Sequence, residues 1–152
     1  MEIKRFEEKY NDLVNQFVIS IFLEEFGFEQ YRNVLENESN IKFQENGGDL
    51  WICFDDEGKI IGTVAVERFE ENKMILKKMY VNKKYRGKGI AQELFDKVLE
   101  FCKENVVKEI VLGTFHELER AIQFYTKNGF EEMEELRRDD GARFFKLEIN
   151  YI

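Results

Sequence analysis

The chain has 152 residues, 43% of them hydrophobic, which is enough for a core and predicts a single domain over residues 1–152. The formal net charge of −8 argues against general affinity for nucleic acid or for an anionic membrane surface. The N-terminus has no apolar run of signal-peptide length, and no window approaches the roughly 18 consecutive apolar residues of a membrane span, so we expect a cytoplasmic protein.

The chain is predicted to begin with a strand and a long helix. Residues 3–6 read as a short strand. Over residues 13–26 the apolar side chains recur at helical spacing, which predicts a helix that turns Leu13, Phe17 and Ile21 toward the core.

The next part of the chain is predicted to be a helix, a loop and three strands. A short helix is expected over residues 29–37, and the polar segment 37–48 reads as a loop. Two strands, 50–54 and 59–68, flank the turn sequence Asp-Asp-Glu-Gly, which is a hairpin signal. A further strand is expected over residues 72–81.

The C-terminal half is predicted to alternate helices and strands. Apolar residues at spacings of three and four predict a helix over 90–105, and residues 108–114 read as a buried strand. A second helix is expected over 118–128, with Gly129 in the position of a C-terminal cap. Two strands joined by an Asp-Asp-Gly turn close the chain over residues 130–151.

This order of elements predicts an α/β fold in which helices cover both faces of a mixed sheet. Cys53 and Cys102 lie inside apolar stretches and do not form a CxxC pair. We therefore expect two reduced, buried thiols, with neither a disulfide nor a metal site.

A basic turn interrupts the acidic chain between the strand at 72–81 and the helix at 90–105. Residues 77–88 contain six basic residues and no acidic one: Lys77, Lys78, Lys83, Lys84, Arg86 and Lys88. The first N–H groups of a helix have no partner within it and carry positive potential. Gly87 and Gly89 allow backbone to approach an anion closely. The turn suits a compact anion such as a diphosphate, although a charge run is also typical of a solvated face.

Two other phosphate-binding loops are excluded. A Walker loop requires Ser or Thr after its Gly-Lys pair, whereas Lys88 is followed by Gly89. A dinucleotide-binding fingerprint requires a third small residue where this chain has Gln92.

The segment R86-G87-K88-G89-I90-A91 resembles the Arg/Gln-x-x-Gly-x-Gly/Ala signature of the GNAT superfamily of acyl-CoA-dependent N-acyltransferases. The likeness includes LKKMYV before the turn and AIQFYTKNGF at 121–130, and it covers about residues 50–135. It implies a three-layer α/β/α fold with a mixed, mostly antiparallel sheet of six to seven strands, splayed at its centre. It also implies an enzyme that transfers acetyl directly from acetyl-CoA to a primary amine of a small molecule or peptide, without a metal.

The resemblance also implies which residues hold the coenzyme. The backbone of Met79, Tyr80 and Val81 would pair with the pantetheine arm. The pyrophosphate would lie on the turn, formed by Arg86, Gly87, Lys88, Gly89, Ile90 and Ala91.

Tyr125, four residues before Gly129, is implied as the general acid for the departing thiolate. A phenol with a pKa near 10 can protonate a thiolate whose conjugate acid has a pKa near 8.5. The alternative role for Tyr125 is that of a core aromatic beside Phe124.

The chain departs from the family pattern at several positions, two of which concern the site. Leu118 stands where many relatives have an asparagine that contacts the cofactor, and a neighbour, Glu117 or Glu119, is left to supply that contact. The strand before the turn lacks the glutamate that commonly acts as base for the amine, so the base stays open between Glu67 and His116, the nearest candidates by chain position.

Acidic residues in the N-terminal helices and the closing hairpin would favour a cationic amine, or would serve only as solvated surface: Glu24, Glu25, Glu29, Glu131, Glu132, Glu134 and Glu135. The final strand offers an edge along which two copies could pair as a homodimer. The alternative to an enzyme is a catalytically silent acyl-CoA-binding module that regulates a partner.

Overall fold

The computed structural model describes residues 1–114 and 119–150, and a seven-stranded sheet forms its centre. The strands are β1 Glu2–Arg5, β2 Asp49–Phe54, β3 Ile60–Glu70, β4 Lys73–Val81, β5 Glu109–Thr114, β6 Glu131–Glu132 and β7 Arg143–Glu148. They lie in the order β1-β2-β3-β4-β5-β7-β6. All neighbouring pairs are antiparallel except β4 and β5, which are parallel.

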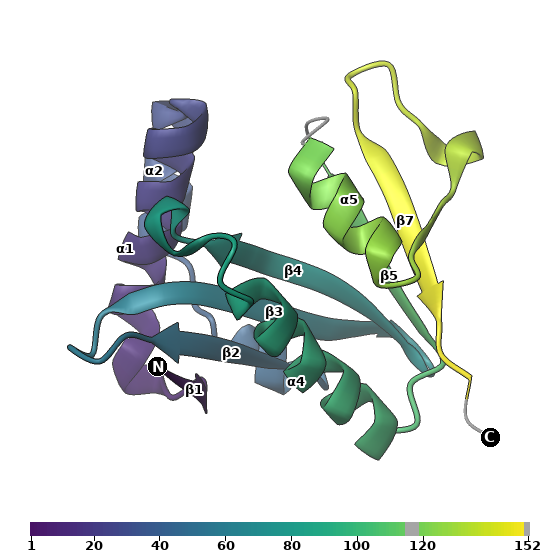
Figure 1. Ribbon diagram of the computed structural model, residues 1–152, viewed down its shortest axis with the longest axis horizontal. Helices are drawn as coiled ribbons and strands as arrows, with labels where there is room; N and C mark the ends of the chain where they lie inside the picture. Colours follow the sequence, from purple (N-terminus) through teal and green to yellow (C-terminus); the bar gives the residue numbers. More distant parts are fainter. Residues whose placement is uncertain (115–118, 151–152) are drawn as a thin grey trace.

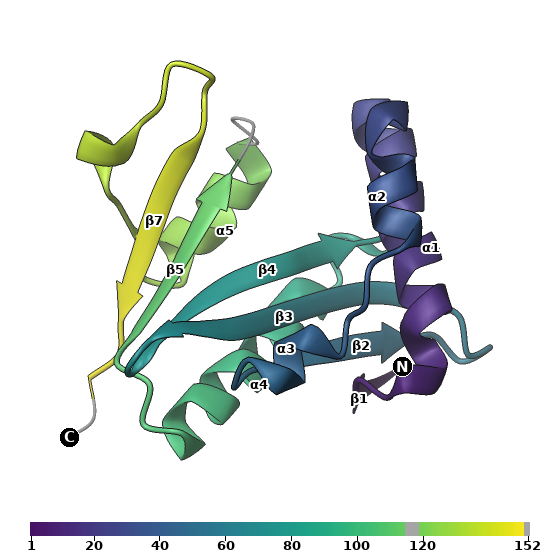
Figure 2. The same ribbon diagram turned by 180° about the vertical axis from the view of Figure 1, so that it is seen from behind.

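Helices cover both faces of this sheet. They are α1 Asn11–Ile21, α2 Arg32–Glu36, α3 Lys42–Glu45, α4 Ile90–Glu104 and α5 Glu119–Lys127. Short single turns are η1 Glu8–Tyr10, η2 Phe22–Phe26, η3 Glu29–Tyr31, η4 Lys83–Tyr85 and η5 Glu134–Leu136. Helices α4 and α5 lie on one face, and α1, α2 and α3 lie on the other (Figures 1 and 2). The predicted three-layer α/β/α fold with a mixed, mostly antiparallel sheet is confirmed.

The first helix turns a different stripe to the core than the sequence pattern predicted. Val14, Phe17, Val18 and Ile21 are buried, whereas Leu13 is 48% exposed. The prediction for Leu13 was wrong because positions 14, 17, 18 and 21 form a complete stripe at a period of 3.6 residues, and Leu13 lies beside it. The helix ends at Ile21, and η2 continues it as one π-helical turn.

The segment predicted as a polar loop over 37–48 contains the short helix α3. The side chain of Phe43 is fully buried in the core between the sheet and α1. Two apolar side chains two residues apart, Ile41 and Phe43, do not make a helical period within this polar stretch, so the sequence pattern missed this turn of helix.

Helix α4 packs closely on the sheet because of a glycine on β3. A Cβ atom at Gly62 would lie 3.0 Å from Cδ1 of Leu94 and 3.2 Å from Cγ2 of Ile90. This close approach fixes the start of α4 beside the end of β4 (Figure 1). The same core contains Cys53 and Cys102, which are free, buried thiols as predicted, and burial raises the pKa of Cys102 to about 12.

The closing hairpin forms, but its final strand is not the edge of the sheet. Strand β7 lies between β5 and β6, and β6 pairs with it at Lys146 and Phe145. The predicted homodimer therefore cannot use a fully open β7 edge, and a dimer stays a prediction. Among the described helices, none is long and apolar enough to cross a membrane.

Candidate functional site

The sheet splits between β4 and β5. These strands pair only at Lys73 with Glu109, Met74 with Ile110, and Ile75 with Val111. Beyond these pairs β4 continues along β3, whereas β5 continues along β7, so the two halves of the sheet diverge (Figures 1 and 2). The predicted splay at the centre of the sheet is confirmed. Among the described strands, none pairs with the edge of β4 that faces this split beyond Ile75.

A β-bulge lies on the part of β4 that borders the split. Ala65 pairs with Lys77 and Thr63 with Tyr80, so the single residue Val64 faces two residues of β4. The bulged residue Lys78 has left-handed backbone geometry with φ 56°, and the Thr63 hydroxyl donates to its carbonyl at 2.7 Å. A bulge takes its residues out of the regular ladder and changes their direction. The bulge therefore changes the direction of the main chain at positions 78 and 79, where β4 borders the split.

The loop between β4 and α4 presents a row of free amides. Among the described residues, no acceptor takes a hydrogen bond from the backbone N–H groups of residues 87–92. Gly89 is the N-cap of α4, and no side chain caps this end. Gly87 and Gly89 have φ values of 77° and 82°, and a Cβ atom on either would meet no atom within 4 Å. These amides of residues 87–92, which we call the amide cradle, are therefore open toward solvent. Such a cradle fits an anion, as other helix N-termini do.

The basic side chains of this loop do not all point into the cradle. Lys83, Lys84 and Lys88 are exposed, and the Lys88 ammonium lies 5.4 Å from the centre of the Tyr85 ring. Arg86 instead contacts the carboxylate of Glu25 in η2 and donates to the Val81 carbonyl at 3.2 Å.

Glu25 also lies 3.7 Å from the guanidinium of Arg120 on α5. Arg86 belongs to the loop that follows β4, and Arg120 lies on α5, which follows β5 (Figure 1). Glu25 therefore contacts residues on both sides of the split. Only 15% of the Glu25 side chain is exposed. The sequence pattern missed this link because Glu25 is far from both arginines along the chain.

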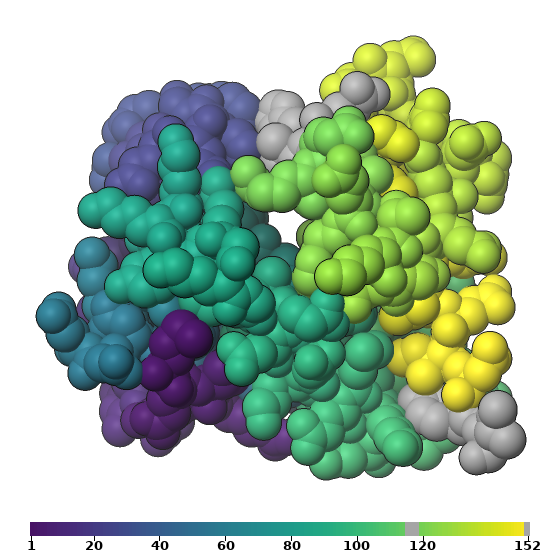
Figure 3. Space-filling view, in the orientation of Figure 1, coloured from purple at the N-terminus to yellow at the C-terminus, as the bar shows by residue number. Residues whose placement is uncertain are grey.

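A second set of contacts, between α4 and the C-terminal end of α5, also joins the two sides of the split. The side chain of Gln92 on α4 donates to Asn128 at 2.9 Å, and the rings of Phe95 and Phe124 lie 6.1 Å apart. Between these contacts and Glu25, the surface is hollowed where the loop before α4 faces α5 (Figure 3).

Tyr125 projects from α5 into the buried wall of the split. Burial raises the pKa of its hydroxyl to about 12, so the hydroxyl keeps its proton through the neutral range. Burial also raises the pKa of Tyr80 on β4 well above its usual value, and charges on Tyr125 and on Glu38 would raise it further. Tyr125 also packs on Phe124, Phe130 and Phe145, so it serves the core as well.

Glu67 lies at the closed end of the split, opposite Ile75. Its carboxylate accepts from Lys77 at 2.5 Å and from Asn46 at 3.0 Å. Burial raises the pKa of Glu67, but these two hydrogen bonds outweigh it and bring the pKa below its usual value. The distance along β4 from Ile75 to Met79 is about 13 Å at 3.3 Å per residue. The role of Glu67 as a base stays a prediction.

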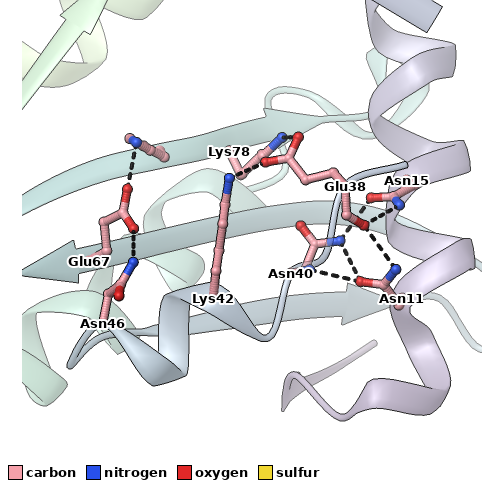
Figure 4. A network of polar contacts seen from close by, with 9 residues as sticks. Asn11, Asn15, Glu38, Asn40, Lys42, Asn46, Glu67 and Lys78 are labelled. Atoms are coloured by element: carbon pink, nitrogen blue, oxygen red, sulfur yellow. Dashed lines mark hydrogen bonds and ion pairs between the residues drawn. The ribbon is translucent and has the colours of Figure 1, made fainter. Parts of the chain in front are cut away.

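A second ion network lies beside the bulge, and the sequence reading did not assign it (Figure 4). The two carboxylate oxygens of Glu38 bind Lys42 at 2.5 Å and Lys78 at 3.1 Å. Burial raises the pKa of Glu38, but the two lysines outweigh it and bring the pKa below its usual value. Burial lowers the pKa of Lys78, with Glu38 opposing that effect. The sequence pattern did not point to Glu38 as a site residue, because Glu38 lies in a polar segment without hydrophobic periodicity.

The main chain of Glu38 is held by helix α1. Its carbonyl accepts from the side chains of Asn11 at 3.0 Å and Asn15 at 2.8 Å. Asn40 in turn donates to the side-chain oxygens of both asparagines (Figure 4). Three linked asparagines thus hold the main chain from which the Glu38 carboxylate extends.

Many of the acids predicted to attract a cationic amine are already paired with arginine. Glu29 binds Arg32, and Glu132 binds both Arg137 and Arg143. His116, Glu117 and Leu118 lie outside the described residues. Within the described parts of the chain, no group of three or more His, Cys, Asp or Glu side chains could hold a metal ion.

Comparison with known proteins gives several relatives. Residues 11–130 match the model of the Acetyltransferase (GNAT) family. An acetyltransferase of the GNAT family from Staphylococcus aureus Mu50, known from its crystal structure, is 32% identical, with 98% of this chain and 99% of that chain covered and a TM-score of 0.83. The paiA N-acetyltransferase of Thermoplasma acidophilum, solved in complex with coenzyme A, shares the fold with a TM-score of 0.71 at 17% identity, with 97% of this chain and 98% of that chain covered.

Among curated proteins, the N-acetylaspartate synthetase of Xenopus tropicalis is 40% identical over 91 residues, which are 59% of this chain and 33% of that protein. The human N-acetylaspartate synthetase is 38% identical over 88 residues, which are 57% of this chain and 29% of that protein. The match thus spans about a third of the length of these curated relatives.

Proposed function

Because the chain belongs to the acetyltransferase (GNAT) family, we propose that it transfers an acetyl group from acetyl-CoA directly to a primary amine of a small molecule or peptide. The observation that carries this proposal is the split between β4 and β5, which has free amides at its mouth and a bulged strand edge along its wall. We further propose that residues 1–152 act as one N-acetyltransferase domain.

The amide cradle would bind the pyrophosphate of the coenzyme. Main-chain N–H groups of Gly87, Lys88, Gly89, Ile90 and Ala91 are assigned to this role, and Arg86, whose own N–H donates to the Lys83 carbonyl at 3.4 Å, would contribute its guanidinium charge. Hydrogen bonds to a charged group contribute roughly 1.5–3 kcal/mol each, so three or four of them could supply much of the roughly 8 kcal/mol of micromolar binding. The fit is supported by the open space around both glycines.

The free edge of β4 would hold the reactive part of the substrate. The backbone of Met79, Tyr80 and Val81 would pair with the extended pantetheine arm, which takes the place of a missing strand. At the bulge, the N–H of Met79 would donate to the thioester carbonyl. Such a donor stabilises the negative charge that develops on oxygen as the amine attacks.

Tyr125 would donate a hydrogen bond to the departing sulfur. Its raised pKa keeps the proton in place until the thiolate forms. A phenol of this pKa is a weaker acid than a thiol, so its main effect would be to stabilise the thiolate charge. A proton from the attacking nitrogen would then complete the thiol.

A catalytically silent acyl-CoA-binding module is the second candidate. It is favoured by the engagement of Glu67, whose carboxylate is already bound to Lys77 and Asn46. A module of this kind would need the cradle and the β4 edge but not a base.

Release of free thiol separates the two candidates. Acetyl-CoA should raise the melting temperature of the protein under both, because both bind the coenzyme. Only the enzyme should release coenzyme A thiol when a panel of primary amines is added. Coenzyme binding without thiol release from any amine would favour the silent module, and the absence of coenzyme binding would contradict both.

A further inference from the structure

The ion network beside the bulge identifies the chemical class of the acceptor, on the premise that the proposed transferase function holds. The network consists of Glu38, Lys42 and Lys78, and its two ion pairs share one carboxylate. The side chains of Lys78 and Glu38 are only 12% and 14% exposed. Both charges are therefore largely removed from water and depend on each other.

The network lies where an acceptor must approach. Lys78 directly precedes Met79, whose N–H is assigned to the thioester carbonyl. The ring of Tyr80 packs on Phe22 at 5.8 Å, which places the network on the face of the sheet that α1 and α3 cover (Figure 4). The amide cradle lies at the start of α4, on the opposite face (Figure 1). On the proposed function, the amine would enter from the side away from the nucleotide, which is the side on which Glu38 and Lys78 lie.

The charge of this face does not suit a polycation. Lys42 and Lys78 share the carboxylate of Glu38, and the neighbouring Lys77 binds Glu67. These three lysines thus meet only two carboxylates within the ion pairs beside the bulge, and the ammonium groups of Lys42 and Lys77 add to the effect of burial in lowering the pKa of Lys78.

A simple amine would also leave a buried charge without a partner. Its ammonium could bind Glu38 only by displacing Lys78 or Lys42. A displaced lysine in this buried position would lose its counter-ion, and breaking one side of a buried pair is costly. An acceptor that brings its own carboxylate removes this cost.

We propose that the acceptor is an amino acid, or another amine with a carboxylate close to its nitrogen. Its ammonium binds the carboxylate of Glu38, and its carboxylate binds the ammonium groups of Lys78 and Lys42. Each ion pair of the free protein is then exchanged for another, and no charge is left alone. The three asparagines that fix Glu38 hold this site in position.

The transfer step balances as follows. The acceptor ammonium carries three protons, and loss of one to solvent by way of Glu38 frees the lone pair. The nitrogen attacks the thioester carbon, a C–N bond forms and the C–S bond breaks. Of the two remaining protons, one stays on the amide nitrogen and one ends on sulfur. The products are an N-acetyl amino acid and free coenzyme A thiol.

The test compares acceptors that differ only in the carboxylate. Phenylalanine, phenylalaninamide and phenethylamine share one side chain, and aspartate and spermidine extend the range of charge. Thiol release from acetyl-CoA gives kcat/KM for each. We expect the amino acids to exceed the amide and the amines by at least tenfold. In Lys78→Met, kcat/KM for the amino acid should fall by about tenfold to a hundredfold, as expected for one lost charge-assisted hydrogen bond, while that for the amide changes less.

Lys73→Met is the matched control, because Lys73 also lies on β4 and pairs with Glu70 and Glu109 at the closed end of the split. It should keep the preference for the carboxylate. Lys42→Met replaces Lys78→Met if the latter fails to fold. Equal turnover of amino acid and amide by the unaltered protein, or an equal loss for both in Lys78→Met, would overturn the proposal.

The transferase function can fail separately. Thiol release from no acceptor would contradict it, and calorimetric titration of the coenzyme A complex would then test the site alone. Phenylalanine should bind more tightly than phenylalaninamide, with the difference lost in Lys78→Met. Equal binding of the acid and the amide would refute the carboxylate site.

Discussion

Ile75 and Val111 form the last residue pair that joins β4 to β5. Beyond this pair the two halves of the sheet separate, and every proposed catalytic or coenzyme-binding residue except Glu67 lies along the open part of the split or at its mouth. The position of this pair sets how far a ligand can enter.

Gly89→Glu should abolish the stabilisation that coenzyme A confers. The new carboxylate would lie beside the free amides, and a residue other than glycine at φ 82° costs about 1–2 kcal/mol. Thermal melts with and without coenzyme A measure both effects. Gly58→Glu is the control, since Gly58 has φ 80° and equally open surroundings in the β2–β3 turn. Both variants should lose similar stability, but only Gly89→Glu should lose the response to coenzyme A.

Tyr125→Phe should lower kcat by about a hundredfold with little change in coenzyme affinity, because the lost hydroxyl acts on the departing sulfur. The raised pKa of about 12 means that the hydroxyl stays protonated below about pH 10, so it should add no alkaline limb to the kcat profile in that range. Tyr85→Phe is the control, since the Tyr85 hydroxyl contacts Asp55 outside the split. Unchanged turnover in Tyr125→Phe would leave Tyr125 only its packing role.

Glu67→Gln should reduce kcat/KM less than tenfold, because Glu67 already binds Lys77 and Asn46 and lies at the closed end of the split. Glu38→Gln should cost more, since Glu38 lies beside the bulge. Steady-state rates for both variants, with thermal melts to check folding, show which of the two carboxylates contributes more to kcat/KM. The reverse order would support Glu67 as the base.

Glu25→Gln should tighten coenzyme A binding by about threefold to tenfold. The Glu25 carboxylate competes with the diphosphate for Arg86 and links it to Arg120 across the mouth of the split. Calorimetry at low salt measures the change. Glu29→Gln serves as the control, because exposed Glu29 binds Arg32 away from the mouth. Weaker binding in Glu25→Gln would mean that Glu25 supports the cradle instead.

The closing hairpin should become less stable in acid through Glu132. Hydrogen bonds from Arg137 and Arg143 lower the pKa of Glu132 to about 2. A lowered pKa stabilises the folded form above the unfolded value near 4.3, and this contribution is lost as pH falls toward 2. Melting temperatures between pH 5 and about 2.5 should fall less steeply in Glu132→Gln than in the unaltered protein. Parallel curves would exclude this contribution.

Patterns that depend on local spacing could be predicted from sequence. The hairpin of β2 and β3, the stripe of α4 and the glycine turn before α4 each follow from neighbours within a few residues. The contacts that join distant segments could not. Glu38 meets Lys78 across 40 positions, and Glu25 meets Arg120 across the split, so neither pairing leaves a periodic trace.

The same limit explains why the composition favoured a cationic amine, whereas the structure leads us to propose an amino acid as acceptor. From composition, the acids near the two ends of the chain favoured a cationic amine. In the folded protein Glu29 and Glu132 are paired with arginine, while Lys77 and Lys78 of β4 and Lys42 of α3 bind Glu67 and Glu38 beside the bulge. Charge that is counted along a sequence differs from charge that a ligand meets, because folding decides which groups neutralise each other.

The bulge at Lys78 has a consequence for solubility. An unpaired strand edge inside a sheet is a surface on which another chain can form a ladder, and exposed edges of this kind promote aggregation. Here the left-handed residue breaks the regular hydrogen-bonding repeat, and two adjacent lysines place charge on the same stretch. A long intruding strand would find no continuous register, whereas a short arm needs only a few main-chain bonds. If the pantetheine arm binds as proposed, the irregular edge would pair with this short ligand and would not pair with a long foreign strand.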